Sequence, residues 1–385
     1  MRSSGRLSGP AFTVVVVLAI ALATALSAAA AEIPVGVNAE LTGSIPVVGQ
    51  SCVNAARMAV DEVNQGGGLL VGGQRYTIRL FVEDNEDKAQ SAVAAAQKLY
   101  SQNSVIAMIG PNASRNAVPA ADIAESERAP MITPWSTNPN TTKNKSYVFR
   151  AAFTDDFQGR VVASFARQQF KAQRAAVLYD VASEYNKGIA EVFRKSFTDL
   201  GGQVVAFETY TTGDKDFLSQ LTKIRAARPE VLFLPNYYSE VPLQVQQAHL
   251  VGLNIPIIGS DSWGFPDLIK LGGADMEGLM YTTHYAPDIA TPAAQAFIKR
   301  YEARYGSVPD DVAALTYDSF QLLFMALQKA GKVDRQAVRD ALASIERYDG
   351  VTGTMQFRGT GDPIKSAVVI QIKDGQFKYF ATATP

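Results

Sequence analysis

The sequence has very few of the residues that build disulfides and metal centres. Its 385 residues include one cysteine, Cys52, and two histidines, His249 and His284. One cysteine excludes an internal disulfide, and a lone thiol in an oxidising compartment is usually tolerated because it is buried. Two histidines and one cysteine without metal-ligand spacing argue against a zinc site, and His249 beside polar Gln246 and Gln247 is typical of a surface position. We therefore expect neither a metal nor a cofactor.

The common sequence motifs of catalysis are absent as well. No Gly-x-Ser-x-Gly elbow supplies a serine nucleophile, and no Walker-type Gly-Lys-Ser/Thr run is present. The glycines at 66–68 follow an expected helix, whereas a dinucleotide fingerprint follows a strand. The acidic residues Glu83, Asp84, Glu86 and Asp87 end an expected strand, where such a cluster is typical of a solvated turn and helix cap. We therefore expect that the protein is not an enzyme.

Neither sign of charge is in excess. The chain has 36 Lys and Arg residues against 37 Asp and Glu residues, and removing Arg2 and Arg6 from the first group leaves 34 against 37. So weak and mixed a charge argues against a nucleic-acid partner and against binding to an anionic membrane surface.

An apolar run near the N-terminus predicts export. Arg2 and Arg6 precede this run at 12–26, which ends in the small residues Ser27–Ala31. The run is shorter than the ~20 apolar residues of a spanning helix, and no later segment is apolar enough to cross a membrane. We predict a signal peptide over residues 1–31, a mature start at Glu32 and a periplasmic location. No cysteine stands at the cleavage site, so a lipid anchor is not expected.

The rest of the chain alternates predicted strands and helices, which is the pattern of an α/β protein with parallel sheets. The predicted strands lie at 33–38, 76–82, 105–110, 130–133, 147–150, 175–179, 204–210, 231–235, 257–259, 278–283, 368–372 and 376–380. The predicted helices lie at 49–64, 89–100, 117–126, 157–169, 185–200, 217–227, 240–251, 292–305, 312–330 and 334–344. The alternation begins again near residue 150, and about 350 mature residues are typical of two domains. Since no low-complexity linker separates them, we expect two lobes joined by several strands that act as a hinge.

Polar and aromatic residues cluster at the carboxyl ends of five predicted strands, where open α/β sheets bind their ligands. The segments are 111–114, 134–137, 180–185, 236–240 and 260–263, and they carry Ser114, Trp135, Ser136, Thr137, Tyr185, Tyr237 and Asp261. Taken singly, Ser114 and Asp261 are typical of cap or turn residues. Because the segments come from both expected lobes, together they predict a shared ligand-binding cleft.

The order of short motifs along the chain resembles the leucine/isoleucine/valine-binding protein family, the type I periplasmic solute-binding proteins that serve branched-chain amino acid ABC importers. The matching segments are Val35–Gly43, Gly49–Gln50, Asp61–Gly67, Ile109–Gly110, Met131–Pro134, Asn236–Glu240, Gly252–Leu253 and Asp349–Gly353. Each motif is short, but together they span almost the whole mature chain in the family's order. The resemblance implies two Rossmann-like lobes, joined by three crossings, that close on a ligand. We place lobe 1 at residues 32–148 plus 281–358 and lobe 2 at 152–278 plus 362–385.

The resemblance also implies how the carboxylate of an amino acid is held. Ser114 and Thr137 match hydroxyls that bind this group, with backbone amides near Trp135 and Ser136. Hydroxyl and backbone N–H groups are the donors that a carboxylate out of water needs.

The amino group is expected on the other side of the cleft. Tyr185 matches an aromatic residue that contacts the ligand from the second lobe, and Tyr237 and Asp261 match the pair that meets the α-ammonium. A buried ammonium needs a negatively charged acceptor, which Asp261 supplies, and aromatic faces add cation–π attraction. We expect no catalytic residue among them.

Three positions depart from the family. Val48 stands where some members have an aromatic lid, Trp135 stands where small residues are common, and Asp261 is one methylene shorter than the glutamate of some relatives. The expected ligand is an amino acid, branched-chain or similarly aliphatic, and the expected partner is the ABC permease of the inner membrane, with the protein itself a monomer. A binder of an aromatic acid, an amide or another non-amino-acid solute remains open, as does a sensory ligand domain.

Overall fold

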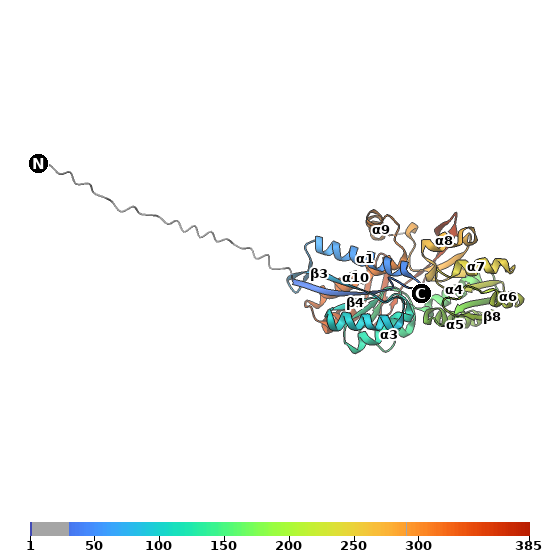
Figure 1. Ribbon diagram of the computed structural model, residues 1–385, viewed down its shortest axis with the longest axis horizontal. Helices are drawn as coiled ribbons and strands as arrows, with labels where there is room; N and C mark the ends of the chain where they lie inside the picture. Colours follow the sequence, from blue (N-terminus) through green and yellow to red (C-terminus); the bar gives the residue numbers. More distant parts are fainter. Residues whose placement is uncertain (2–30, 290) are drawn as a thin grey trace.

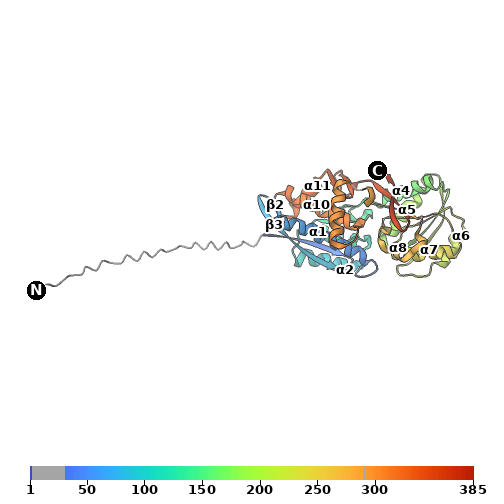
Figure 2. The same cartoon turned by 90° about the horizontal axis from the view of Figure 1, so that it is seen from above.

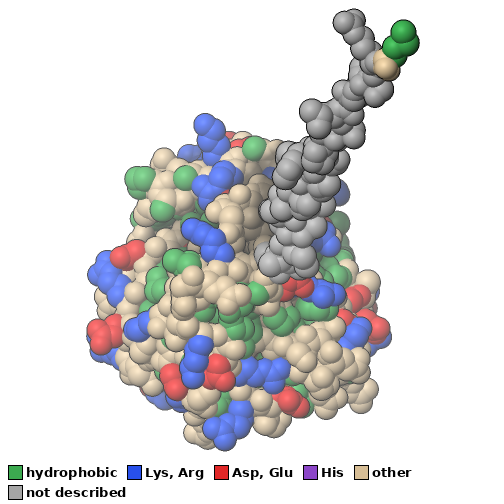
Figure 3. All heavy atoms as spheres, turned by 90° about the vertical axis from the view of Figure 1, so that its left-hand side faces the viewer, with side chains coloured by type: hydrophobic (Ala, Val, Ile, Leu, Met, Phe, Trp, Pro, Cys, Tyr) green, Lys and Arg blue, Asp and Glu red, His purple; other side chains and the backbone are tan. Residues whose placement is uncertain are grey.

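Two lobes lie side by side along the long axis of the molecule (Figures 1 and 2). The computed structural model describes residues 1, 31–289 and 291–385, so the signal peptide expected at 1–31 falls almost wholly outside the described residues. The α/β fold class with parallel sheets and two lobes is confirmed. On the end of the first lobe, basic and acidic side chains are interspersed without a large patch of either sign (Figure 3).

The first lobe is built on a six-stranded sheet with the order β2-β3-β1-β4-β5-β6. Its strands are β1 (Ala31–Ala39), β2 (Leu69–Val71), β3 (Gln74–Asp84), β4 (Ala107–Ile109), β5 (Met131–Thr133) and β6 (Val148–Arg150), and its first helices are α1 (Pro46–Gln65), α2 (Ala89–Gln97) and α3 (Ser114–Ser126). All neighbours pair parallel except the hairpin of β2 and β3. The central strand β1 buries Ile33, Val35 and Val37 completely, as an apolar strand covered on both faces must.

The second lobe is built on a seven-stranded sheet with the order β16-β15-β11-β10-β9-β7-β8. Its strands are β7 (Arg174–Asp180), β8 (Gln203–Tyr210), β9 (Val231–Leu234), β10 (Ile257–Gly259), β11 (Met280–Thr283), β15 (Ala367–Lys373) and β16 (Gln376–Ala383). The helices of this lobe are α4 (Asp155–Gln169), α5 (Glu184–Asp199), α6 (Leu218–Ala226), α7 (Val241–Leu250) and α8 (Pro266–Gly272). The β7–β11 strands run parallel, and β15 and β16 close the edge as an antiparallel pair.

The chain crosses between the lobes three times. It leaves the first sheet after β6, and it returns after β11 with α9 (Pro292–Tyr305), α10 (Asp311–Ala330) and α11 (Arg335–Ala343). Of these, α10 packs on α1, β2 and β4 of the first lobe. A small sheet of β12 (Arg347–Gly350), β13 (Gly353–Phe357) and β14 (Pro363–Ile364) follows, and the chain then enters β15 of the second sheet.

The second crossing lies later in the chain than the boundary expected at 278–281. β11 (Met280–Thr283) pairs parallel with β10 and antiparallel with β15, so residues 281–283 belong to the second sheet and not to lobe 1. All four residues of the strand are buried. Because β10 and β15 would otherwise leave buried backbone groups unpaired, the strand has to stay in this sheet.

Gly49 fixes how closely helix α1 approaches the end of β1. A Cβ atom at this position would lie 2.3 Å from the backbone carbonyl of Glu40. The Glu40 side chain in turn accepts hydrogen bonds from the backbone N–H groups of Asn112 and Ala113, at 3.1 and 3.0 Å. The close approach therefore anchors the segment that leads into α3.

We predict that Gly49→Ala destabilises the protein by roughly 1–3 kcal/mol, because the added methyl group overlaps backbone that cannot rotate away. Urea unfolding measures the loss. Gly264→Ala is the matched control, since a Cβ there would meet no atom nearer than 3.6 Å. Equal stabilities for the two variants would contradict the steric role of Gly49.

Candidate functional site

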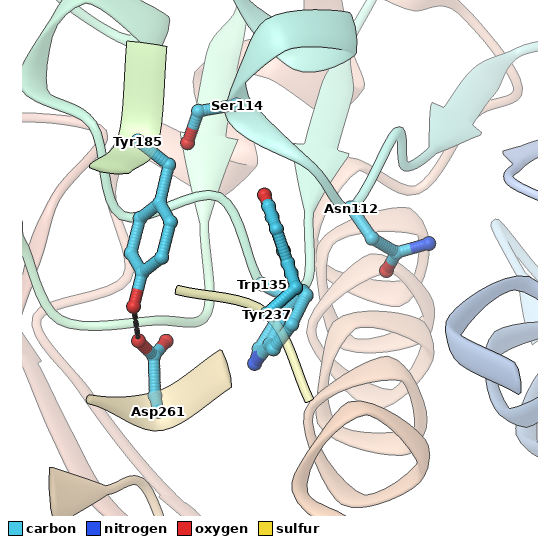
Figure 4. A pocket seen from close by; sticks show the side chains of 6 residues that line it. All are labelled: Asn112, Ser114, Trp135, Tyr185, Tyr237 and Asp261. Carbon is cyan, nitrogen blue, oxygen red and sulfur yellow. Dashed lines mark hydrogen bonds between the residues drawn. The ribbon is translucent and has the colours of Figure 1, made fainter. Parts of the chain in front are cut away.

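One cavity between the lobes brings together most of the expected ligand-binding residues (Figure 4). Its lining residues are Asn112, Ser114, Trp135, Tyr185, Tyr237 and Asp261, and they surround about 160 Å³ of empty space. Ser114 is the first residue of α3 and Trp135 follows β5, so both come from the first lobe. The other three expected residues, in α5 and after β9 and β10, come from the second lobe. Strand ends of both sheets therefore face the same space.

Asp261 is the buried charge of this cavity. One carboxylate oxygen accepts a hydrogen bond from the Tyr185 hydroxyl, as Figure 4 shows, and the other lies 3.1 Å from His284 Nε2. Burial, followed by the charge of Asp261, raises the pKa of Tyr185 well above its ordinary value, so this hydroxyl keeps its proton and donates. Both oxygens of Asp261 therefore have a polar contact inside the cavity wall.

Two further buried carboxyl groups flank Asp261. Asp155 accepts a hydrogen bond of 2.6 Å from the Thr137 hydroxyl, and Asp311 accepts one of 2.8 Å from the Thr283 hydroxyl. Burial raises the pKa of both groups well above the ordinary range, and the charge of Asp261 raises it further. Both are thereby biased toward the protonated form.

Trp135 is at once a wall of the cavity and a packed residue. Its Nε1 donates to Asp311 at 3.1 Å, and its ring meets the edge of Phe265 at 5.6 Å between centroids. The indole also lies 6.1 Å from the Tyr237 ring across the cleft, and 4 % of its surface is exposed. The indole therefore lines the cavity and is also packed by contacts from both lobes.

The residues expected to bind a carboxylate are only partly brought together. The Ser114 hydroxyl lines the cavity, but the Ser136 hydroxyl lies behind it, 2.8 Å from Ser114 Oγ and 2.8 Å from Thr141 Oγ1. The Thr137 hydroxyl donates to Asp155 and does not line the cavity. Neither Ser136 nor Thr137 therefore presents a free hydroxyl to this space.

A cation also reaches across the cleft. Arg115 of α3 lies 5.0 Å over the ring of Tyr237 in the other lobe, and it is held by Asp87, whose Oδ1 accepts from Arg115 Nε at 2.8 Å. Asp87 lies in the turn expected for the acidic cluster, but its side chain is buried beside the cleft and not solvated. The contact joins the two lobes at the rim of the cavity.

Three residues in or beside the cavity were not predicted from the sequence: Asn112, His284 and Asp311. Asn112 lies within the segment 111–114, at the carboxyl end of a predicted strand, so its position alone could have marked it as a candidate. His284 follows β11 directly, so it also stands at the carboxyl end of a strand, where ligand-binding residues are expected. Asp311 opens helix α10, far along the chain from the strands that it faces, and no local pattern marks it.

The described residues also limit other kinds of site. In the described part of the chain, no three side chains of histidine, cysteine, aspartate or glutamate gather as metal ligands would. Over the same residues, no helix combines the length and apolar character that a membrane crossing requires. His249 lies partly exposed beside Asp275, with 2.9 Å between Nδ1 and the carboxylate, and Cys52 is a buried free thiol.

Two α/β lobes whose strand ends enclose a polar and aromatic cavity define a two-lobed ligand-binding protein. The family model described as periplasmic binding protein matches residues 32–376. The chain belongs to the periplasmic binding protein family, as the motif order indicated.

Relatives and solved structures share the whole fold. A Leu/Ile/Val-binding protein from Rhizobium johnstonii is 30% identical over 335 residues, which are 86% of this chain and 89% of the relative. The crystal structure of a leucine-binding protein from Thermotoga maritima is 33% identical with a TM-score of 0.87, and the alignment covers 92% of this chain and 99% of that one. A branched-chain amino acid transporter substrate-binding protein from Streptococcus pneumoniae, solved in complex with isoleucine, is 30% identical with a TM-score of 0.84 over the same shares of the two chains.

We predict that Asp311→Asn stabilises the protein relative to wild type more at pH 7 than at pH 4. The raised pKa of Asp311 in the folded state adds stability that is present below about pH 4 and is lost as the pH rises. The amide oxygen of Asn can still accept from Trp135 and Thr283, so the variant keeps these bonds without the titration. Urea unfolding at both pH values tests this, with Asp122→Asn as an exposed control. A stability difference that does not change with pH would contradict it.

Proposed function

We propose that the protein is the periplasmic substrate-binding component of an ABC importer, and that it captures an amino acid with an aliphatic side chain by closing its two lobes. The observation that carries the proposal is the environment of Asp261. The Tyr185 hydroxyl donates to one oxygen of the carboxylate and His284 Nε2 lies 3.1 Å from the other, and no lysine or arginine among the described residues pairs with it.

A buried carboxylate without a cation is costly unless a ligand supplies the positive charge. Burial lowers the pKa of His284 to about 4, so its imidazole is neutral near pH 7 and does not cancel the charge of Asp261. Asp155 and Asp311 favour their protonated forms and add no positive charge. An α-ammonium group would supply the positive charge that Asp261 lacks, and a neutral or purely anionic ligand would not.

The opposite side of the cavity suits an anion. The Ser114 hydroxyl lines the cavity at the first residue of α3, where the backbone N–H groups of Ser114 and Arg115 have no hydrogen-bond partner among the described residues. The positive end of the helix dipole favours a carboxylate at the same place. A ligand with an ammonium near Asp261 and a carboxylate near Ser114 spans the cavity from one lobe to the other.

The ligand's side chain is restricted by space. The empty space of the cavity, about 160 Å³, is bounded by the rings of Trp135, Tyr185 and Tyr237. Two of the similar proteins described above are named as leucine- or Leu/Ile/Val-binding proteins, and one of the solved structures contains bound isoleucine. A branched-chain or smaller aliphatic amino acid is therefore the ligand we propose.

A second candidate is an aromatic acid, an amide or another solute without an amino group. The rings of Trp135, Tyr185 and Tyr237 in the cavity wall favour it, because flat ligands stack on such faces. Such a ligand would bring no positive charge to Asp261, which is why we rank it second. A sensory ligand domain is the remaining alternative, and binding measurements alone do not separate it from a transport protein.

The partner and the location are parts of the same proposal. We propose that the protein acts in the periplasm after loss of the segment 1–31, and that it delivers its ligand as a monomer to an inner-membrane permease. The family membership supports this assignment. Co-purification of the ligand-loaded protein with its permease in detergent or nanodiscs is the direct measurement.

We predict that Asp261→Asn weakens leucine binding by ~2–5 kcal/mol, or roughly 30-fold to several thousand-fold, and leaves the fold intact. The amide keeps the shape of the side chain but removes the charge that meets the ammonium. Isothermal titration calorimetry on refolded, ligand-free protein measures the change, with leucine, isoleucine, valine and benzoate as probes.

The matched control for this experiment is Asp275→Asn, which removes the carboxylate of the partly exposed Asp–His pair on the surface. It should bind like wild type. If Asp261→Asn binds leucine as tightly as wild type, or if benzoate binds and leucine does not, the ligand is not an amino acid.

We predict that Trp135→Gly shifts the preference toward larger amino acids and leaves recognition of the ammonium and carboxylate in place. The indole occupies space that the variant frees for a ligand side chain. Competition between alanine, valine, leucine and phenylalanine for each protein measures the order of preference. Trp135→Phe keeps an aromatic wall and should keep the wild-type order. An unchanged order in Trp135→Gly, with a large loss of melting temperature, would assign the indole to packing alone.

A further inference from the structure

His284 occupies a position that links the hinge to the cavity. It follows β11 at the start of the second crossing, and its imidazole is completely buried. The ring stacks on Phe153 of the first crossing with 3.7 Å between centroids and 24° between planes. The stack fixes the plane of the imidazole ring, and in this orientation Nε2 lies 3.1 Å from Asp261 Oδ2.

The hydrogen bonds around the ring identify the nitrogen that carries the proton. Asp261, ionised, can only accept, so Nε2 must donate. Among the described residues Nδ1 has no hydrogen-bond partner. A neutral ring protonated at Nε2 leaves a bare nitrogen at Nδ1, whereas an imidazolium would bury an N–H group without an acceptor.

The charged groups around the ring give the same result. Burial lowers the pKa of His284 to about 4, the hydrogen bond and charge of Asp261 act in the opposite direction, and the charge of Lys365 on the third crossing lowers it further. Asp155 of α4 and Asp311 of α10 face Asp261 and favour their protonated forms because burial raises their pKa. Tyr185, the other donor to Asp261, keeps its proton for the same reason.

We propose that His284 is a positioning residue that acts through Asp261: as a neutral N–H donor it holds the carboxylate toward the cavity, and its protonation cancels the charge that the cavity offers to a cationic ligand. The binding part of this inference rests on the function proposed above. Protons and the ligand then compete, since an imidazolium and an ammonium both pair with the same carboxylate. Ligand affinity falls with acidity by up to about tenfold per pH unit once His284 takes up a proton.

The proton position is measured without any ligand. The protein has two histidines, so His249→Gln leaves His284 as the source of the imidazole signals in two-bond ¹H–¹⁵N NMR spectra. We expect a neutral ring protonated at Nε2 at pH 7, with protonation setting in near pH 4. A ring protonated at Nδ1, or an imidazolium at pH 7, would overturn the proposal.

The effect on binding is measured by calorimetry with leucine as the probe. His284→Phe keeps the stack on Phe153 but removes the donor, and we expect roughly 10- to 150-fold weaker binding at pH 7. His284→Gln restores an N–H donor that cannot take up a proton, so its affinity at pH 7 should return most of the way to wild type. Between pH 6 and pH 3.5, wild type should lose about fourfold more affinity than His284→Gln.

The control is His249→Gln, which alters the His–Asp pair on the surface and should follow the wild-type pH profile. Wild-type affinity in His284→Phe, or the wild-type pH profile in His284→Gln, would refute the positioning role, because a merely structural residue would not change the pH profile. If wild type binds no amino acid at any pH, the proposed function fails, and the NMR measurement decides the position of the proton independently.

Discussion

The site depends on one buried carboxylate, Asp261, that is held by neutral donors. It stands at the carboxyl end of β10, where a doubly wound sheet presents side chains to the cleft. Tyr185 and His284 fix its two oxygens, and the neighbouring carboxyl groups of Asp155 and Asp311 favour protonation because they are buried beside it. The charge of the cluster thus stays on the residue that faces the cavity, where a cationic group of the ligand can reach it.

The three crossings between the lobes are tied to one another by side chains. Phe153 on the first crossing stacks on His284 of the second, and Lys365 before β15 donates to the carbonyl of Ala151 on the first crossing at 3.3 Å. Lys365 also donates to Thr352 at 2.8 Å, and burial lowers its pKa to about 8. His284 therefore connects the first two crossings to the site, because its ring stacks on Phe153 and its Nε2 contacts the Asp261 carboxylate.

The sequence predicted the long periodic elements well and the short ones poorly. The helices predicted at 292–305 and 312–330 agree with α9 and α10, whereas β2, α8 and the strands β12–β14 were not among the predicted elements. Each of these has only two to seven residues, which carry little periodicity. Strand ends located Ser114, Tyr185 and Asp261, since that rule follows from parallel-sheet geometry. It could not show that the Thr137 hydroxyl points to Asp155, or that Asp311 of a distant helix binds Trp135, because both contacts depend on tertiary packing.

Asp261 has room for a ligand without giving up the donors that hold it. A carboxylate offers about four lone-pair positions, and Tyr185 and His284 occupy two of them. Two remain for the N–H groups of an ammonium. A ligand ammonium can therefore donate to Asp261 while Tyr185 and His284 keep their contacts with it, so the carboxylate need not give up either contact to bind the ligand.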